Sequence, residues 1–177
     1  VGINHNGSLD KAKKMIDVAN EAGADAVKFQ TFKAEEFCSP DQMFTYYSQG
    51  KQIKESMLQM FKRFEFSSDS WKEIKKHCDE IGITFFSTPQ NLTDLEFLQK
   101  IGIPAIKIGS DDLTNLPLIG KYVETGLPII LSSGMSNLSE VHQALEVAKW
   151  FEGYPLALLL CTSQYPTPTE DVNLSKI

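Results

Sequence analysis

The chain has 177 residues, of which 42% are hydrophobic and 23% charged, the values of an ordinary globular domain with a sizeable core. Its formal net charge of −6 argues against general binding to nucleic acids or to an anionic membrane surface. No apolar stretch is as long as a membrane span, and three cysteines without CxxC spacing fit a reducing compartment such as the cytoplasm.

The first elements predict a strand, a helix and a second strand. Residues 1–3 read as the end of a strand, and Ser8 is a suitable N-cap for a helix over residues 9–22. The second strand, within residues 23–31, carries Lys28 and Gln30, which are two positions apart and so point to the same side. We expect this side to be the interior of a barrel near its opening, although an exposed strand end is the alternative.

Residues 32–66 are rich in aromatic side chains and have the least regular pattern in the chain. We expect a helix over residues 53–64 in this segment. A long insertion after a strand is usually a lid or a substrate-facing loop, while aromatic packing against the rest of the domain explains most of the phenylalanines. A helix over residues 70–81, capped by residues 67–69, follows it.

The rest of the chain alternates between short β-prone runs and helical segments. We expect strands within residues 82–89, 102–110, 126–134 and 154–163, and helices at residues 92–101, from residue 116 toward Gly126, and at residues 139–151. Alternation of this kind predicts a parallel sheet with crossover helices, and hence an α/β fold of the TIM (β/α)₈ barrel class. Such barrels typically need about 250 residues, so we expect an incomplete portion of about six βα units.

Both ends of the chain read as cut, and we interpret residues 1–177 as one barrel domain truncated at both ends. An incomplete barrel has two open edges with unpaired backbone groups. Apolar runs such as residues 156–160 then lack cover on one side. We therefore expect these residues alone not to form a stable monomer.

Polar side chains collect where the predicted strands end, which is where α/β barrels keep their active sites. These residues are Lys28, Gln30, Thr88, Lys107, Ser110, Ser132 and Ser163. Two amines with several hydroxyls and backbone amides suit a tetrahedral anion such as a phosphate. A lysine within an apolar strand is rare unless it has a partner, although Lys107 reaching water from a strand end is the structural alternative. No Ser-His-Asp order and no Gly-x-Ser-x-Gly motif supports a hydrolase.

Two further groups allow both a functional and a structural interpretation. His5, in the polar turn after the first strand, is a candidate for substrate contact but also suits bonding to neighbouring backbone. Asp111 and Asp112 are possible metal ligands, yet adjacent residues seldom converge on one ion. A solvated loop or an N-cap is the expected role of the two aspartates.

Several motifs resemble those of the sialic acid synthase (N-acetylneuraminate synthase) family, specifically its N-terminal barrel domain. They are NHNG at 4–7, KFQTFK at 28–33, FSTP at 86–89, KIGS at 107–110, NLPLI at 115–119, LSSGM at 131–135 and CTSQYPTP at 161–168. They occur in the family's order and span nearly the whole chain.

The resemblance implies an enzyme that condenses phosphoenolpyruvate with N-acetylmannosamine or a related N-acetylated amino sugar. The products are N-acetylneuraminate, or a related nonulosonic acid, and phosphate. By motif match, the residues that hold the phosphate and carboxylate of phosphoenolpyruvate are Lys28, Thr88, Lys107, Ser110 and Ser132, with the two lysines as electrostatic stabilisers. Gln30, Ser163 and Tyr165 would lie close to the reacting ends or the sugar; many members have Asn where this chain has Ser163.

The resemblance also implies parts that these residues do not include. They are a glutamate before Val1, two histidines beyond Ile177 that bind a divalent metal (manganese or magnesium), and a C-terminal antifreeze-like domain. Family members assemble as homodimers in which this domain contributes to the active site. We therefore expect residues 1–177 alone to be inactive and to hold no metal.

Two alternatives remain open from the sequence. A synthase for legionaminic or pseudaminic acid uses the same phosphoenolpyruvate half with a different sugar. A non-catalytic, sugar-binding barrel is a different class of protein. Loss of the phosphate lysines would indicate the non-catalytic barrel, and both Lys28 and Lys107 are present.

Overall fold

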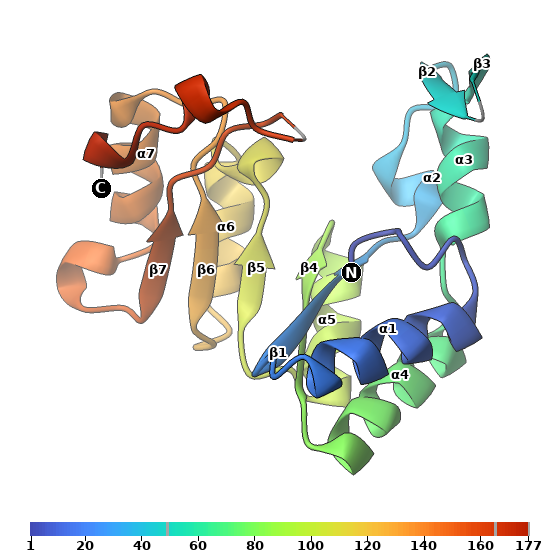
Figure 1. Cartoon of the computed structure of the whole chain (residues 1–177). Coiled ribbons are helices and arrows are strands. Elements are labelled where there is room, and N and C mark those ends of the chain that lie inside the picture. The colour runs from blue at the N-terminus through green and yellow to red at the C-terminus, as the bar shows by residue number, and fades with distance from the viewer. Residues whose placement is uncertain (49, 165, 177) are drawn as a thin grey trace. The chain divides into compact units, whose positions relative to one another are not determined.

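The computed structural model describes residues 1–48, 50–164 and 166–176, and the chain divides into two compact units, Val1–Ile103 and Pro104–Ile177 (Figure 1). In both units parallel strands alternate with helices, which confirms the predicted α/β class. The first unit contains α1 (Leu9–Glu21), β1 (Ala26–Thr31), α2 (Ala34–Phe37), β2 (Met43–Ser48), β3 (Lys51–Ser56), α3 (Met57–Phe64), α4 (Ser68–Ile81), β4 (Thr84–Pro89) and α5 (Leu92–Ile101). The second unit contains β5 (Ile106–Ile108), the 3₁₀ turn η1 (Ser110–Asp112), α6 (Leu116–Val123), β6 (Ile129–Ser132), α7 (Leu138–Val147), η2 (Trp150–Glu152), β7 (Leu156–Leu159), η3 (Thr169–Asp171) and η4 (Leu174–Lys176).

Two helices of the first unit, α1 and α5, begin directly after a residue whose side chain caps them. The Ser8 side chain accepts the Lys11 amide at 3.3 Å, and Asn91 accepts the Asp94 amide at 2.9 Å. A side-chain cap of this kind satisfies one of the backbone N–H groups that have no partner within the helix. Residues 1–3 differ from the expected strand end, because only Gly2 forms a bridge, with Phe29.

Strands β1 and β4 of the first unit run parallel, from the pair Ala26–Thr84 to the pair Thr31–Pro89. One face packs on the helices: the rings of Phe29 and Phe85 lie 5.7 and 6.3 Å from that of Trp71 in α4. Because side chains alternate along a strand, Lys28 must point to the face opposite the helices.

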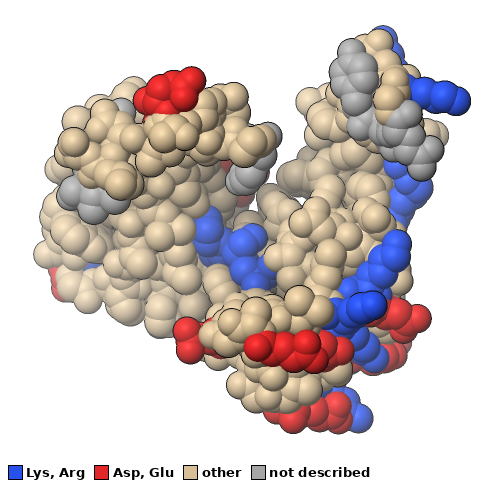
Figure 2. Space-filling view, in the orientation of Figure 1, with Lys and Arg blue, Asp and Glu red and all other residues tan. Residues whose placement is uncertain are grey.

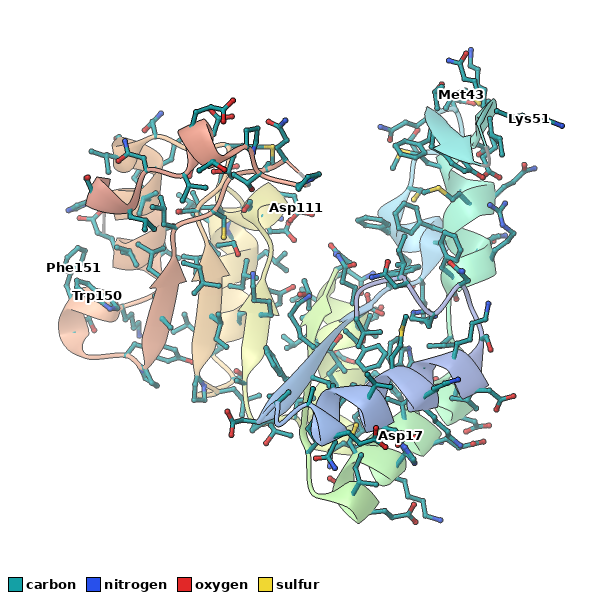
Figure 3. All side chains as sticks on the ribbon, viewed as in Figure 1. Asp17, Met43, Lys51, Asp111, Trp150 and Phe151 are labelled. Carbon is teal, nitrogen blue, oxygen red and sulfur yellow. The ribbon has the colours of Figure 1, made fainter. Side chains whose placement is uncertain are left out.

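Helices α1 and α4 lie side by side on the surface of the first unit (Figure 1). Asp17, which is labelled in Figure 3, lies in α1, and its Oδ1 is 2.6 Å from Nε2 of His77 in α4. Acidic and basic side chains alternate over this surface (Figure 2), partly as ion pairs such as Lys13–Glu73. Exposed pairs of this kind contribute about 0–1 kcal/mol each, so this surface mainly keeps the unit hydrated.

The helix expected over residues 53–64 is wrong in its first part. Residues 43–48 and 51–56 form an antiparallel hairpin, with Met43 and Lys51 in its two strands (Figure 3), and the helix α3 begins only at Met57. The β-prone residues 44–47 and the left-handed Gly50 (φ +75°) favour a hairpin turn. Cross-strand pairing therefore outweighs the helical spacing of the second strand.

The second unit contains three parallel strands in the order β5-β6-β7, with Ile108 paired to Leu131 and Leu131 to Leu158. Helices α6 and α7 lie along this sheet (Figure 1). Ile106, Ile108 and Leu131 are fully buried and alternate with Lys107 and Ser132. The polar pair therefore shares the other face of the sheet.

Helix α7 ends earlier than the sequence indicated, at Val147 rather than Phe151. Lys149 adopts a left-handed backbone (φ +55°), which ends the helix and begins the η2 turn. This turn leaves Trp150 and Phe151 exposed on its surface (Figure 3). Leu158 and Leu159 in β7 are also exposed, as expected for a run without cover on one side.

No helix in the described ranges is long and apolar enough to cross a membrane.

We expect Tyr154→Phe to destabilise the full-length protein by about 1 kcal/mol. The Tyr154 hydroxyl donates to the Leu127 carbonyl at 2.7 Å and lies 3.3 Å from the Val123 carbonyl, so it ties the chain before β7 to the end of α6. The measurement is the urea midpoint. Tyr46→Phe is the matched control, because the Tyr46 hydroxyl donates to Glu55 within the hairpin. We expect this control to lower the urea midpoint by less than Tyr154→Phe does. Equal changes in the two midpoints would contradict the prediction.

Candidate anion-binding site

The first unit brings together Lys28, Gln30 and Thr88 from the carboxyl ends of β1 and β4. Gln30 is paired with Thr88, and Lys28 with Phe86, so all three candidates occupy the face opposite the helices. The prediction that Lys28 and Gln30 share a side is confirmed.

The Lys28 amine lies in an environment that disfavours its own charge. Burial lowers the pKa of Lys28 below its usual value, and its Nζ donates to the Phe29 carbonyl at 3.4 Å. Among the described residues no carboxylate forms an ion pair with Lys28. An anion at this amine would restore the favourable interaction that burial removes.

The second unit brings Lys107 and Ser132 into direct contact. Lys107, only 9% exposed, donates to the Ser132 hydroxyl at 2.6 Å and also to the Ile108 carbonyl. Cys161 Sγ, which follows β7, lies 3.4 Å from the same hydroxyl. The Lys107 amine therefore lies at the strand end, where it can donate a charge-assisted hydrogen bond to an anion.

The remaining candidates of the second unit lie in the turns after the strands. The Ser110 hydroxyl, after β5, accepts the Gly134 amide at 3.0 Å. Ser163 is exposed in the segment after β7, with its hydroxyl against the backbone of Gly134. Tyr165 lies outside the described residues.

The candidates therefore form two groups, one in each unit: Lys28, Gln30 and Thr88 in the first, and Lys107, Ser110, Ser132 and Ser163 in the second. Both groups combine an amine with hydroxyls at the carboxyl ends of parallel strands. Charge-assisted bonds from amines, supported by hydroxyl and backbone donors, are what phosphate and carboxylate oxygens accept.

Sequence reasoning did not identify two residues that contact the second group, Gly134 and Cys161. The signal that could have found them is their position: Gly134 follows β6 and Cys161 follows β7, next to polar residues that were candidates. Neither residue type carries a charge that distinguishes it from an ordinary turn residue.

His5 has a structural role in the turn before α1. It is 1% exposed, its ring stacks on Phe66 at 4.3 Å, and its Nδ1 accepts the Gly7 amide at 3.0 Å. Burial lowers the pKa of His5 to about 4, so the ring is neutral at pH 7 and keeps the lone pair that this bond needs. The alternative in which His5 bonds neighbouring backbone is the one that the contacts support.

Asp111 and Asp112 form the η1 turn after β5, where Figure 3 labels Asp111. The Asn115 side chain donates to Asp112 Oδ1 at 3.4 Å, as in a solvated turn. Within the described residues no three His, Cys, Asp or Glu side chains gather as metal ligands. The divalent metal that the resemblance implies stays a prediction, with its two histidine ligands expected beyond Ile177.

Parallel strands joined by helices, with amines and hydroxyls at the strand ends, define an α/β protein of the barrel type. The NeuB family model matches residues 15–177, and the chain belongs to this family.

Its relatives and solved neighbours include several sugar acid synthases. It is 40% identical over 176 residues to the N,N'-diacetyllegionaminic acid synthase of Campylobacter jejuni, covering 98% of this chain and 53% of that protein. It is 36% identical over 185 residues to the human N-acetylneuraminate-9-phosphate synthase, covering 100% of this chain and 49% of that protein. The crystal structure of the N-acetylneuraminic acid synthetase of Leptospira borgpetersenii in complex with citrate matches 99% of this chain and 57% of that one, with a TM-score of 0.87 and 34% identity. The chain thus spans about half the length of the curated relatives it matches.

Proposed function

We propose that the full-length protein condenses phosphoenolpyruvate with an N-acetylated amino sugar, such as N-acetylmannosamine, to give N-acetylneuraminate or a related nonulosonic acid and phosphate. The observation that carries the proposal is the buried Lys107 bonded to the Ser132 hydroxyl at a strand end. The half-buried Lys28 in the first unit, which forms no ion pair among the described residues, supports it. Family membership supplies the reaction class.

In the proposed reaction the third carbon of phosphoenolpyruvate attacks the sugar aldehyde, water adds at the second carbon, and phosphate leaves. Lys28 and Lys107 would stabilise the phosphate and carboxylate charges, with Thr88, Ser110 and Ser132 as hydrogen-bonding partners. Gln30, Ser163 and Tyr165 are assigned to the reacting ends or the sugar. The manganese or magnesium ion stays a prediction with ligands beyond Ile177, and we derive no step through it.

The homodimer and the cytoplasmic location are part of the same proposal. All three cysteines are free thiols, which fits a reducing compartment. The oligomeric state of the full-length protein in solution tests the dimer, and a monomer at working concentration would refute it.

The acceptor sugar separates two candidate activities within the family. The 40% identity to a legionaminic acid synthase makes a diacetamido sugar the second candidate, beside N-acetylmannosamine and its phosphorylated form. Both candidate activities use phosphoenolpyruvate as one of the two substrates, so the proposed roles of Lys28 and Lys107 hold for either.

The test is phosphate release from phosphoenolpyruvate by the full-length protein, supplied with manganese and with each of the three sugars in turn. Release with one sugar supports the synthase and identifies its acceptor. If the protein bound a sugar but released no phosphate from phosphoenolpyruvate with any of the three sugars, the result would favour the non-catalytic barrel and overturn the proposal.

A further inference from the structure

The turn after β6 joins the ends of three strands of the second unit. The Ser133 amide and hydroxyl both donate to the Leu159 carbonyl of β7, at 3.1 and 2.9 Å. The next residue, Gly134, donates its amide to the Ser110 hydroxyl, which follows β5. Adjacent residues of one turn therefore bond to both neighbouring strands.

Gly134 has no room for a side chain, although its backbone is not left-handed. A Cβ atom added to Gly134 would lie 2.6 Å from the Ser163 hydroxyl oxygen and 2.8 Å from that of Ser110. Both distances are shorter than side-chain carbons tolerate, so any other residue would displace one hydroxyl or both. Glycine at this position therefore keeps both serine hydroxyls where they are.

Met135, the next residue, has a left-handed backbone (φ +59°) and is 74% exposed. A residue other than glycine in this conformation is strained, and such strain persists where the surrounding contacts enforce it. The bonds of Ser133 and Gly134 to the two neighbouring strands are contacts of this kind. They hold the turn in one conformation.

We propose that Gly134 is a positioning residue for the anion site, because its amide orients the Ser110 hydroxyl and its missing side chain leaves room for the hydroxyls of both Ser110 and Ser163. It acts through these two serines, beside the Lys107–Ser132 pair. The inference rests on the proposed function, since Ser110 and Ser163 are assigned to the substrates there. Gly134 carries no charge and no hydrogen-bonding side chain, so a search for polar residues does not find it.

The test is Gly134→Ala in the full-length protein, with the affinity for phosphoenolpyruvate measured by calorimetry and the melting temperature measured in parallel. We expect affinity to fall by on the order of tenfold, the equivalent of one or two displaced hydrogen bonds. Gly120→Ala is the matched control: Gly120 lies in α6, and an added Cβ would meet only Val147, at 3.8 Å. This control should bind phosphoenolpyruvate as the unchanged protein does.

A double-mutant cycle with Ser110→Ala separates positioning from a general effect on the turn. Once the Ser110 hydroxyl is absent, Gly134→Ala should weaken binding by a smaller factor than it does in the unchanged protein. An equal factor in both backgrounds, or unchanged affinity in Gly134→Ala, would overturn the inference and leave the proposed function intact. If the unchanged protein does not bind phosphoenolpyruvate, the proposed function fails, and the inference fails with it.

Discussion

Replacing Lys107 with methionine is expected to weaken phosphoenolpyruvate binding by the full-length protein by about 1.5–3 kcal/mol, or roughly 10- to 150-fold. Methionine keeps much of the apolar length of the side chain and removes the charge. The Ser132 hydroxyl also loses the donor that contacts it at 2.6 Å, so the change affects two of the proposed phosphate ligands. Calorimetric titration with phosphoenolpyruvate measures the effect.

Two further variants calibrate this result. Ser110→Ala removes a neutral hydroxyl and should weaken binding by about 1 kcal/mol, less than the loss of a charged donor. Lys121→Met removes a surface lysine that is paired with Glu124, and it should leave affinity unchanged. Unchanged affinity in Lys107→Met would show that Lys107 serves only to stabilise the sheet.

The elements that local chemistry determines were predictable from the sequence. Helix α5 was predicted at its observed bounds, because Asn91 caps its start and the left-handed Gly102 ends it. The shared side of Lys28 and Gln30 followed from the period of two along a strand. The polar residues at the strand ends indicated that Lys107 and Ser132 lie together. The structure adds the hydrogen bond between them, at 2.6 Å.

The features that were missed depend on contacts between segments. The hairpin of β2 and β3 forms because two strands pair, and the helical spacing of residues 53–56 contains no trace of that pairing. Gly134 acquires a role only because Ser110 and Ser163 come from other strands. Asp94 looked like an ordinary residue in the first turn of a helix, and its burial depends on the segment around α2 and α3.

Asp94 is a buried carboxyl group in a negative environment. It is 4% exposed, and its Oδ2 has no hydrogen-bond partner within the described part of the chain. Burial first, and then the charge of Glu36 in α2, raise the pKa of Asp94 to about 7; Glu65 adds to the effect, and a Gln90 backbone bond and Lys33 oppose it. The N-terminal end of a helix normally favours the ionised form of an aspartate, so burial here outweighs the helix dipole.

This raised pKa makes the stability of the protein depend on pH. An unfolded aspartate titrates near pH 3.9, so between about pH 4 and pH 7 the folded state holds a proton that the unfolded state has released. The slope of unfolding free energy with pH is then negative, up to about 1.4 kcal/mol per pH unit for one proton. The contribution of Asp94 is therefore fully present below about pH 4 and is lost as pH rises through about 7.

Asp94→Asn is expected to remove this dependence, because the amide has a similar shape and carries no charge. At pH 8 the variant should be more stable than the unchanged protein by on the order of 2–4 kcal/mol, and near pH 4 the two should be similar. Urea unfolding of the full-length protein at several pH values measures the difference. Subtracting one curve from the other cancels the contributions of groups that titrate equally in both proteins.

Asp69→Asn supplies the comparison for a charge in the same helical setting. Asp69 also lies in the first turn of a helix, but its side chain is 86% exposed and pairs with Lys72 at the surface. Removing this exposed charge should change the free energy of unfolding by about 0–1 kcal/mol, because exposed ion pairs contribute little. If the stability difference between Asp94→Asn and the unchanged protein did not grow between pH 4 and pH 8, the Asp94 carboxyl would be ionised in the folded protein at neutral pH. Its neighbours Glu36 and Glu65 would then have to move away from it or take up the proton themselves.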